Sequence, residues 1–311
     1  MRETIYESQN HPYSLFHVGA RISKFLLFQY FYRLRQLRYF ILRFKTKSGT
    51  VARYVQGSKM QLHLDDRGIS ADLALDGIRE PLSTKTVHEW VREGYAIVDI
   101  GANIGYYALM ESGLAGKKGK VYAIEPSPNN FSNLVKNIKL NGYKNIQAFK
   151  LGIGDKNGSA KMYISPHSNL NSLVVQKNKR IISTIQINIA TLDKFLKNKK
   201  YPDFIRMDVE GYEYNIIKGM KNMLKLRRPL KIFIELHPHI MGRDKIIYVL
   251  KTLKNNGFGI KNMFRCFTMP EMKIKGRGEY DYSSREIADV LNDESIISGS
   301  KGAFEIFFER K

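Results

Sequence analysis

One apolar segment that runs straight into a glycine-rich turn constrains the fold more than any other part of this sequence. Residues 96–100 read AIVDI, residues 101–105 read GANIG, and the helix-like stretch YYALMESGLA follows at once. A buried strand, a glycine turn and a helix in this order form the first unit of a doubly wound α/β sheet. Gly101 and Gly105 permit a tight turn and a close approach to a ligand, because neither carries a Cβ. We therefore expect a Rossmann-like domain that begins near residue 95.

Two acids near this turn indicate which nucleoside the domain binds. Glu125 ends the next apolar segment, about 20 residues past the turn, where a carboxylate typically accepts hydrogen bonds from ribose hydroxyls. A dinucleotide would also need the pattern GxGxxG for its pyrophosphate, whereas this turn reads DIGANIG. S-adenosylmethionine carries no phosphate, and its cationic end suits an acid at the tip of the first strand. The sequence thus favours S-adenosylmethionine over NAD, and the residues expected to bind it are Asp99, Gly101, Asn103, Gly105, Glu125 and Pro126.

The third strand and the turn after it complete the expected cofactor site. Residues 146–153 are predicted to form this strand, which leads into Gly154 and Asp155. By position Gly152 to Asp155 should lie near the adenine, with Asp155 as an acceptor for its amino group. A simple turn is an equal alternative for this Gly-Asp pair.

The ends of the predicted fourth and fifth strands, residues 203–209 and 231–236, carry ionisable side chains. The groups concerned are Asp208, Glu210, Glu235 and His237. Side chains alternate along a strand, so the first two share one face, as do the last two. Because ligands of open α/β sheets bind at the carboxyl ends of the strands, we expect the four groups to converge on one cleft.

These groups suit methyl transfer. In that reaction the enzyme must hold the acceptor oxygen in line with the sulfonium methyl group, and a base must remove the proton of the acceptor hydroxyl. Asp208 and His237 are the preferred base or orienting group. Glu210 has an alternative place in the first turn of a helix beginning at Gly211, where the helix dipole favours a carboxylate. His237 is as readily a structural histidine at the end of a strand. A divalent metal held by two carboxylates and an imidazole is a less favoured alternative, and no metal is assigned.

Five blocks of sequence, taken together, resemble the FkbM family of methyltransferases. They are VDIGANIGYYAL at 98–109, VYAIEPSPNNFSNLVKNIKLNG at 121–142, ATLDKF at 190–195, FIRMDVEGYEYNIIKG at 204–219 and IFIELHPH at 232–239. The resemblance implies a class I methyltransferase fold, with a seven-stranded sheet whose last strand is antiparallel, S-adenosylmethionine as donor and usually an oxygen acceptor. One catalytic candidate departs from the family's pattern K-x-D-x-E-G, since Arg206 replaces the lysine. Arginine keeps the charge but is not deprotonated in proteins, so Arg206 is not expected to transfer a proton.

The first 60 residues form a basic appendage. Between Ser8 and Leu64 the sequence has no Asp or Glu and ten Lys or Arg residues, out of a net charge of +22 for the chain. Aromatic and aliphatic residues interleave with these cations from Phe25 to Phe44, which predicts a long basic amphipathic helix. Residues 20–47 are candidates to associate with an anionic membrane surface. The alternatives are RNA, with strongly salt-dependent affinity, and packing against the chain's own core or a second subunit.

The remaining segments are assigned by their position around the cofactor turn. Residues 61–94 are expected to cover the cofactor cleft, and residues 95–311 to form the S-adenosylmethionine-binding domain, with an insertion at 265–300. This insertion and the loop 166–180 are candidate lids over the acceptor, in which Asn171 and Ser172 are the polar groups of interest.

The cysteine content and the lengths of the apolar segments indicate the cellular compartment. The single cysteine, Cys266, cannot form an intramolecular disulfide and is predicted to be a buried structural thiol. No apolar run reaches the roughly 20 residues that span a bilayer, and the N-terminus does not have the order of a signal peptide. We therefore expect a cytoplasmic protein, peripheral at the membrane if the basic helix binds lipid.

The preferred function is S-adenosylmethionine-dependent methylation of a hydroxyl on a sugar, glycolipid or polyketide-like acceptor. An RNA methyltransferase is the first alternative, but N-methylating enzymes often carry Asn or Asp, two prolines and an aromatic residue after strand four, where this chain has Asp-Val-Glu-Gly. A non-catalytic, membrane-associated binding protein is the second alternative, and an oxidoreductase is least favoured.

Overall fold

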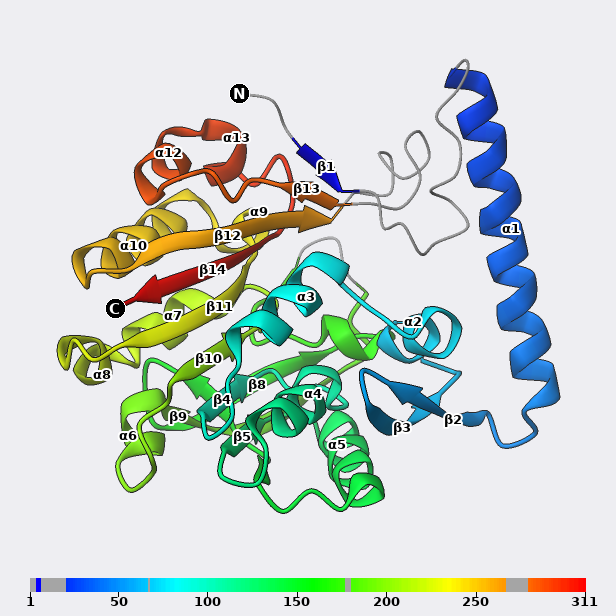
Figure 1. Cartoon of the computed structure of the whole chain (residues 1–311), viewed down its shortest axis with the longest axis horizontal. Coiled ribbons are helices and arrows are strands. Elements are labelled where there is room, and N and C mark those ends of the chain that lie inside the picture. Colours follow the sequence, from blue (N-terminus) through cyan, green and yellow to red (C-terminus); the bar gives the residue numbers. More distant parts are fainter. Residues whose placement is uncertain (1–3, 7–20, 67, 177–179, 267–278) are drawn as a thin grey trace.

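A mainly parallel β-sheet lies between two layers of helices in the computed structural model (Figure 1). The structure describes residues 4–6, 21–66, 68–176, 180–266 and 279–311, with the backbone alone for 4–6 and 21–29. Among these residues the main sheet has nine strands, in the order β1 (Thr4–Tyr6), β13 (Glu279–Asp281), β12 (Gly259–Cys266), β14 (Phe304–Arg310), β11 (Leu230–Leu236), β10 (Phe204–Met207), β4 (Ala96–Ile100), β5 (Lys120–Ile124) and β6 (Ile146–Phe149).

The order of the seven strands from β12 to β6 confirms the predicted doubly wound fold. Strands β11, β10, β4, β5 and β6 are parallel, and β14 runs antiparallel between β11 and β12. Chain order reverses between β4 and β10, so the loops that leave these two strands diverge and form a crevice. The described sheet is wider than predicted, because β13 from the expected insertion and β1 from the appendage extend its edge.

Alternate residues of the strands build a hydrophobic core on each face of the sheet. Val98, Ile100 and Ile205 belong to one core, and Ile97 and Phe204 belong to the other. The first core is closed by α6 (Leu192–Leu196), α7 (Glu213–Lys218), α8 (Lys221–Lys225), α9 (Pro238–Met241), α10 (Arg243–Asn255), α12 (Ile287–Asn292) and α13 (Glu294–Ile297). The second is closed by α3 (Pro81–Trp90), α4 (Tyr106–Ala115) and α5 (Pro128–Asn141). Packing on both faces fixes the strand ends that border the crevice.

The predicted basic helix is present as α1 (Arg21–Lys45), which lies at one side of the molecule (Figure 1). One face of α1 contacts α2 (Ile69–Asp76). On this face Arg35 forms ion pairs with Asp72 at 2.5 Å and with Asp76 at 3.0 Å. The outer stripe of α1 leaves large apolar side chains exposed, namely Tyr30, Tyr32, Leu37, Phe40, Ile41 and Phe44. Part of the helix therefore packs on the chain's own core, as one alternative predicted. None of the described helices is long and apolar enough to cross a bilayer.

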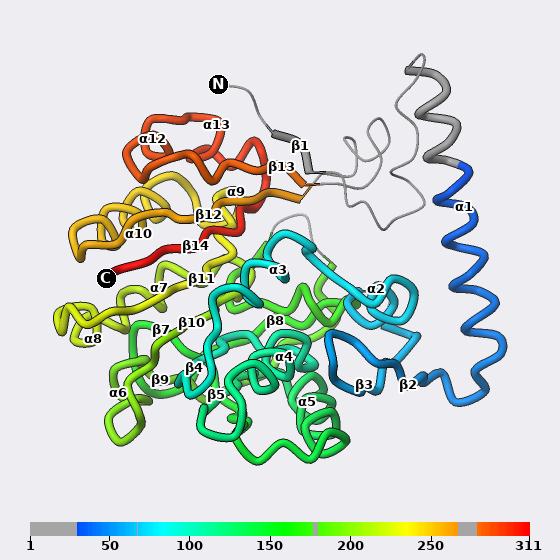
Figure 2. Tube along the Cα trace, viewed as in Figure 1, coloured from blue at the N-terminus to red at the C-terminus, as the bar shows by residue number. Residues whose placement is uncertain are grey.

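The chain runs from α1 through a hairpin of β2 (Thr50–Val55) and β3 (Ser58–His63) into α2 (Figure 2). This hairpin packs on α5, where the Gln61 backbone N–H donates to Oδ1 of Asn137 at 2.7 Å. Leu62 and Leu64 are fully buried beneath it. The segment after residue 60 thus lies over the core as a cover.

Two predicted elements are divided in the structure. The strand expected over 146–153 separates into β6 and β7 (Gly152–Gly154), and β7 joins a second sheet with β9 (Ser183–Thr191) and β8 (Gly158–Ile164). The helix expected after Gly211 separates into α7 and α8 around Gly219. This glycine packs on β7 so closely that a Cβ would lie 1.9 Å from the carbonyl oxygen of Gly154. A side chain at position 219, between α7 and α8, would therefore collide with the backbone of β7.

The prediction for Cys266 is wrong. It is the last residue of β12 and is exposed, because the strand ends there at the edge of its pairing with β13. Residues 267–278, which belong to the expected insertion, lie outside the described residues, as do residues 1–3 and 7–20 of the appendage and 177–179 of the expected lid loop.

Candidate functional site

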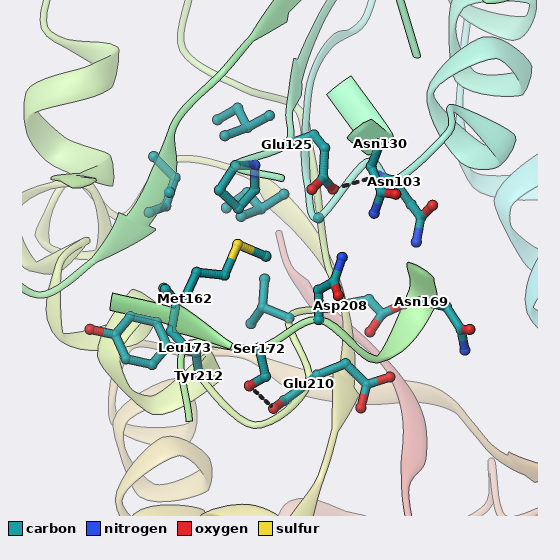
Figure 3. Close-up of a pocket in the computed structure, with 18 of the residues that line it drawn as sticks. Asn103, Glu125, Asn130, Met162, Asn169, Ser172, Leu173, Asp208, Glu210 and Tyr212 are labelled. Carbon is teal, nitrogen blue, oxygen red and sulfur yellow. Dashed lines mark hydrogen bonds between the residues drawn. The ribbon is translucent and has the colours of Figure 1, made fainter. Parts of the chain in front are cut away.

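A cavity opens at the carboxyl ends of β4, β5 and β10, where the predicted cofactor turn lies (Figure 3). Most of its lining residues are apolar, and we call it the apolar cavity. Met162, Leu173 and the ring of Tyr212 lie on one side of it, and Glu125 and the asparagines Asn103 and Asn130 lie across from them. Its other apolar lining residues include Ile100, Ile124, Leu151, Ile153 and Val209. An apolar slot with polar groups along one side suits a nucleoside.

Glu125 lies in the wall of the apolar cavity with both carboxylate oxygens anchored. Oε2 accepts the backbone N–H of Asn103 at 2.9 Å, and Oε1 accepts that of Ser127 at 2.8 Å. Burial raises the pKa of Glu125 to about 7, although these two hydrogen bonds lower it. Pro126 lines the same wall. These two hydrogen bonds fix the orientation of the carboxylate. Its oxygens still have lone pairs that can accept hydrogen bonds from hydroxyl groups of a ligand.

The glycine turn approaches the loop after β10 very closely. Gly101 has a φ of +84°, and a Cβ there would lie 1.9 Å from the carbonyl oxygen of Asp208. Asn103 also has a positive φ, of 51°, and its buried Oδ1 has no hydrogen-bond partner among the described residues. Gly105 is not part of the lining and instead begins α4, where a Cβ would meet Leu134 at 2.9 Å. Helix packing accounts for this glycine, and its contact with the cofactor stays a prediction.

A second cavity, of about 620 Å³, adjoins the first and shares part of its wall, and we call it the charged cavity. The shared residues are Gly101, Asn103, Asn169, Asp208 and Glu210. The remaining lining residues are Ile69, Arg79, Glu80, Ala102, Tyr106, Tyr107, Arg206 and Glu235. Two arginines thus face four carboxylates, so the lining carries a net charge of −2 when all of them are ionised. Such a space suits a polar ligand.

Arg206 is a fixed cation in the wall of the charged cavity. The register of β10 on β4 sets it beside Asp99, and Nη1 donates to Oδ1 of Asp99 at 3.0 Å while Nη2 donates to Oδ2 of Asp208 at 3.1 Å. Its guanidinium carbon lies 4.0 Å from the ring centre of Tyr107. Burial alone lowers the pKa of Arg206, but the two carboxylates outweigh burial and hold that pKa well above its ordinary value.

Asp99 contacts Arg206, and its predicted contact with the cofactor stays a prediction. It is fully buried behind Arg206 and lines neither of the two described cavities. The paired register of β4 and β10 turns its carboxylate toward the guanidinium, so its role is to hold Arg206 in place.

The four ionisable groups expected to converge do lie together. Three potential metal-ligand atoms, one each from Asp208, Glu235 and His237, lie within 4.8 Å of one another. Nε2 of His237 is also 3.9 Å from Oε2 of Glu210. His237 is buried behind the carboxylates and is not among the lining residues. Burial lowers its pKa, but the nearby carboxylates, Glu213 first, outweigh burial and raise the pKa well above the ordinary value.

Glu213, which the sequence did not single out, occupies the place proposed for Glu210. Its Oε1 lies 2.9 Å from Nδ1 of His237 and accepts the backbone N–H of Gly211 at 3.1 Å, at the start of α7. Glu210 precedes the helix, with a φ of 53°, and lines both cavities. The first-turn alternative for Glu210 is therefore wrong.

Other predicted residues lie in different places from those expected. Asp155 lies outside the lining and pairs with Lys218 at 3.4 Å, and Gly154 packs against Tyr212 at the end of β7. Asn171 and Ser172 line the apolar cavity rather than the charged one, because a short loop folds them over it. The described part of the insertion, 279–300, contributes no residue to either cavity.

Among the lining residues of the charged cavity that sequence reasoning did not single out are two tyrosines, an arginine and a glutamate. Tyr106 and Tyr107 begin the helix after the glycine turn, and the first turn of such a helix faces the ligand, so their position was a usable signal. Arg79 and Glu80 come from the cover, where no motif marks them. They reach the cavity because Glu80 accepts the Tyr107 hydroxyl at 2.8 Å and the Arg79 backbone bonds to the Tyr106 hydroxyl at 3.2 Å.

A family model described as "Methyltransferase FkbM domain" matches residues 99–260. The match covers more than half of the chain and includes the glycine turn, Glu125 and all four convergent groups.

Similar proteins include two curated methyltransferases. Hexuronic acid methyltransferase AglP of Haloferax volcanii is 26% identical over 160 residues, which cover 50% of this chain and 62% of that protein. Protein-L-isoaspartate O-methyltransferase of Methanococcus maripaludis is 38% identical over 64 residues, which cover 21% of this chain and 30% of that protein. The chain thus matches less than two thirds of the length of either relative. Among solved structures, M. jannaschii TYW2 in complex with AdoMet gives a TM-score of 0.39 at 16% identity, covering 85% of this chain and 87% of that one.

Proposed function

The chain belongs to the FkbM methyltransferase family, and from this premise we propose that it methylates a hydroxyl oxygen of a sugar, glycolipid or polyketide-like acceptor. S-adenosyl-L-methionine is the methyl donor. The observation that carries the proposal is the junction of the two cavities, where Gly101, Asn103 and Asp208 separate an apolar space from a charged one. A donor whose nucleoside lies in the apolar cavity presents its sulfonium at this junction, beside the acceptor.

The apolar cavity fits the parts of the donor. Met162 and Leu173 offer apolar surface to the adenine, and the Glu125 carboxylate is oriented to accept ribose hydroxyls. The buried Oδ1 atoms of Asn103 and Asn169 have no hydrogen-bond partner within the described parts of the chain. Buried acceptors of this kind call for a donor from a ligand, and the ammonium group of S-adenosylmethionine is one.

The chemical step forms an O–C bond while the C–S bond breaks, and the bonding electron pair stays on sulfur. The hydroxyl proton must pass to a base. We assign this proton to Glu210, because its side chain belongs to a residue that lines both cavities, whereas His237 lies behind the lining. This assignment differs from the sequence-based preference for Asp208 and His237, which become positioning residues. Arg206 stays protonated and orients Asp208.

The segment boundaries follow from these roles. Residues 95–311 hold the donor and the convergent groups, and residues 61–94 form a cover that supplies Arg79 and Glu80 to the charged cavity. Among the described side chains, none from residues 30–60 lines either cavity.

A saccharide is the acceptor that best suits the charged cavity. Its lining of arginines, carboxylates and tyrosines offers many hydrogen-bonding groups and little apolar surface, which suits a polyhydroxylated ligand better than a polyketide. A relative named for hexuronic acid methylation supports the same class.

Calorimetry with S-adenosylmethionine, followed by transfer of a labelled methyl group into lipid, saccharide and RNA fractions of an extract, tests the proposal. We expect one donor site per chain and label in saccharide or glycolipid. Glu210→Gln should lower transfer by roughly 10²- to 10⁴-fold, the usual contribution of a general base, and change donor affinity little. No donor binding at millimolar concentration overturns the proposal, and label in RNA alone replaces it with RNA methylation.

The exposed stripe of α1 supports a second proposal, that the chain works at an anionic membrane surface. Phe40 is 66% exposed and Phe44 is 81% exposed, and Arg33, Lys45 and Lys47 are exposed around them. Aromatic side chains enter the lipid headgroup region, and each nearby cation adds about 1 kcal/mol on an anionic surface.

Sedimentation with vesicles separates this proposal from its alternatives. We expect binding to phosphatidylglycerol vesicles and little binding to phosphatidylcholine vesicles. Phe40→Ser with Phe44→Ser should weaken binding, whereas Tyr54→Ser, a change at an aromatic residue of β2 that is 78% exposed, should not. Binding that is equal for both lipids and both variants contradicts a membrane role for α1.

A further inference from the structure

His237 has the outer partner that metal-ligating histidines commonly have. Its Nδ1 lies 2.9 Å from Oε1 of Glu213, and both residues are buried. A carboxylate in this position accepts a hydrogen bond from Nδ1–H and fixes the ring, and a cation that displaces the proton on Nε2 then binds its lone pair. Glu213 is itself anchored by the Gly211 amide, so the ring has one stable direction.

The Nε2 atom faces oxygen atoms that are too far away for strong hydrogen bonds. Oε1 of Glu235 is 3.5 Å away, Oε2 of Glu210 is 3.9 Å away, and an oxygen of Asp208 completes a group whose members lie within 4.8 Å. Two ligand atoms each 2.0–2.2 Å from one ion, at a tetrahedral angle, are roughly 3.4 Å apart. The separation of His237 and Glu235 is close to that value.

The charge of the surrounding wall favours a cation at the same place. The lining of the charged cavity carries four carboxylates against two arginines, and Glu213 adds a further acid behind His237. Arg206 pairs with both Asp99 and Asp208, so its single charge balances only one of them, and the cavity carries excess negative charge when Glu235 is ionised. Excess charge in a partly enclosed site is costly unless a cation or protons balance it.

We propose that Asp208, Glu235 and Nε2 of His237 hold one divalent cation of the Mn²⁺ or Zn²⁺ class in the wall of the charged cavity. Two carboxylates and one imidazole are ligands suited to these ions. The cation binds the hydroxyl oxygen of the acceptor and lowers the pKa of that hydroxyl, and Glu210 takes the proton. This catalytic role rests on the proposed function, but the binding of the cation does not. The inference departs from the sequence analysis, which assigned no metal.

Titration of the chelator-treated full chain with Mn²⁺, followed by electron paramagnetic resonance and calorimetry, tests the site. We expect one Mn²⁺ per chain. Glu235→Gln and His237→Ala should each weaken binding by at least about tenfold, and Glu213→Gln by roughly 10- to 100-fold, the usual effect of losing an outer partner. Donor affinity, measured in parallel, shows that each variant is folded, because none of these three residues lines the apolar cavity.

A matched control exists at the edge of the sheet, where Cys266, Glu279 and Glu305 form another group with metal-ligand spacing. Glu279→Gln should leave Mn²⁺ binding unchanged. The proposal is overturned by the absence of saturable binding, which would mean that a proton on Nε2 balances the cluster instead. Mn²⁺ binding that persists in both Glu235→Gln and His237→Ala also overturns the proposal. Loss of Mn²⁺ binding in Glu279→Gln does so as well. Mn²⁺ binding without donor binding upholds the site and rejects the proposed function.

Discussion

The two cavities differ in what holds their walls in place. In the apolar cavity the main polar group is fixed by the backbone, since the amides of Asn103 and Ser127 both donate to Glu125. In the charged cavity the side chains hold one another, as Arg206 does with Asp99 and Asp208. A substitution in the first should therefore act locally on the donor. A substitution in the second leaves a buried partner unpaired and should act on stability as well.

The loss of Arg206 offers the strongest test of this contrast. Arg206→Met leaves Asp99 buried without its cation, so we expect a loss of roughly 3–5 kcal/mol in the free energy of unfolding, measured by urea denaturation. The double variant Asp99→Leu with Arg206→Met removes both charges and should recover much of that loss. Equal losses in the single and double variants would show that the charged wall is not held by this pair.

A smaller effect is expected at the glycine that joins the two cavities. In Gly101→Ala the new Cβ meets the carbonyl oxygen of Asp208 and strains a backbone with φ of +84°, which together should cost about 2–4 kcal/mol and abolish measurable donor binding. Gly94→Ala is the matched control, because Gly94 has the same φ and no atom of the described residues within 4 Å of the added Cβ. It should cost only about 1–2 kcal/mol. Similar losses in both variants would argue against close contact at Gly101.

Donor binding should be more sensitive to pH than the stability of the charged wall. Burial raises the pKa of Glu125 to about 7, so lowering the pH from 8 to 6 protonates the carboxylate that accepts the ribose hydroxyls. The dissociation constant for S-adenosylmethionine, measured by calorimetry, should therefore rise as the pH falls through 7. Glu125→Gln should weaken binding roughly tenfold at pH 8, about 1.4 kcal/mol, and flatten the pH profile. An unchanged profile in the variant would assign the pH dependence to another group.

The sequence predicted the strand-end residues of both cavities but not the residues that reach the charged cavity from elsewhere in the chain, for a physical reason. A glycine turn and an acid at the end of the next strand are local patterns, and Gly101, Asn103 and Glu125 lie where those patterns place them. The charged cavity depends on contacts between distant segments. Arg79 reaches it from the cover, and Glu213 fixes His237 across 24 positions of the chain. Such pairs follow from the packing of helices and strands, which residue spacing does not encode.

Two residues predicted to contact the cofactor, Asp99 and Asp155, lie outside the lining of the apolar cavity for the same reason. Asp99 was placed in the cofactor site by its position at a strand tip, but the register of β4 on β10 turns its carboxylate toward Arg206. Asp155 was placed near the adenine on the assumption of one continuous third strand. The division of that strand into β6 and β7 carries Asp155 past the cavity to Lys218.

The smallest effect is expected from a substitution of Asp155, which lies outside the lining of the apolar cavity. Its carboxylate pairs with Lys218 at 3.4 Å on a partly exposed surface, where such a pair contributes about 0–1 kcal/mol. Asp155→Asn should therefore change the dissociation constant for S-adenosylmethionine by less than about twofold, since the residue lines neither of the described cavities. Calorimetry beside Glu125→Gln makes the comparison direct, because both are carboxylate-to-amide changes. A loss in Asp155→Asn as large as that in Glu125→Gln would mean that the loop after β7 closes on the adenine when the donor binds, and the apolar cavity would then be only part of the donor site.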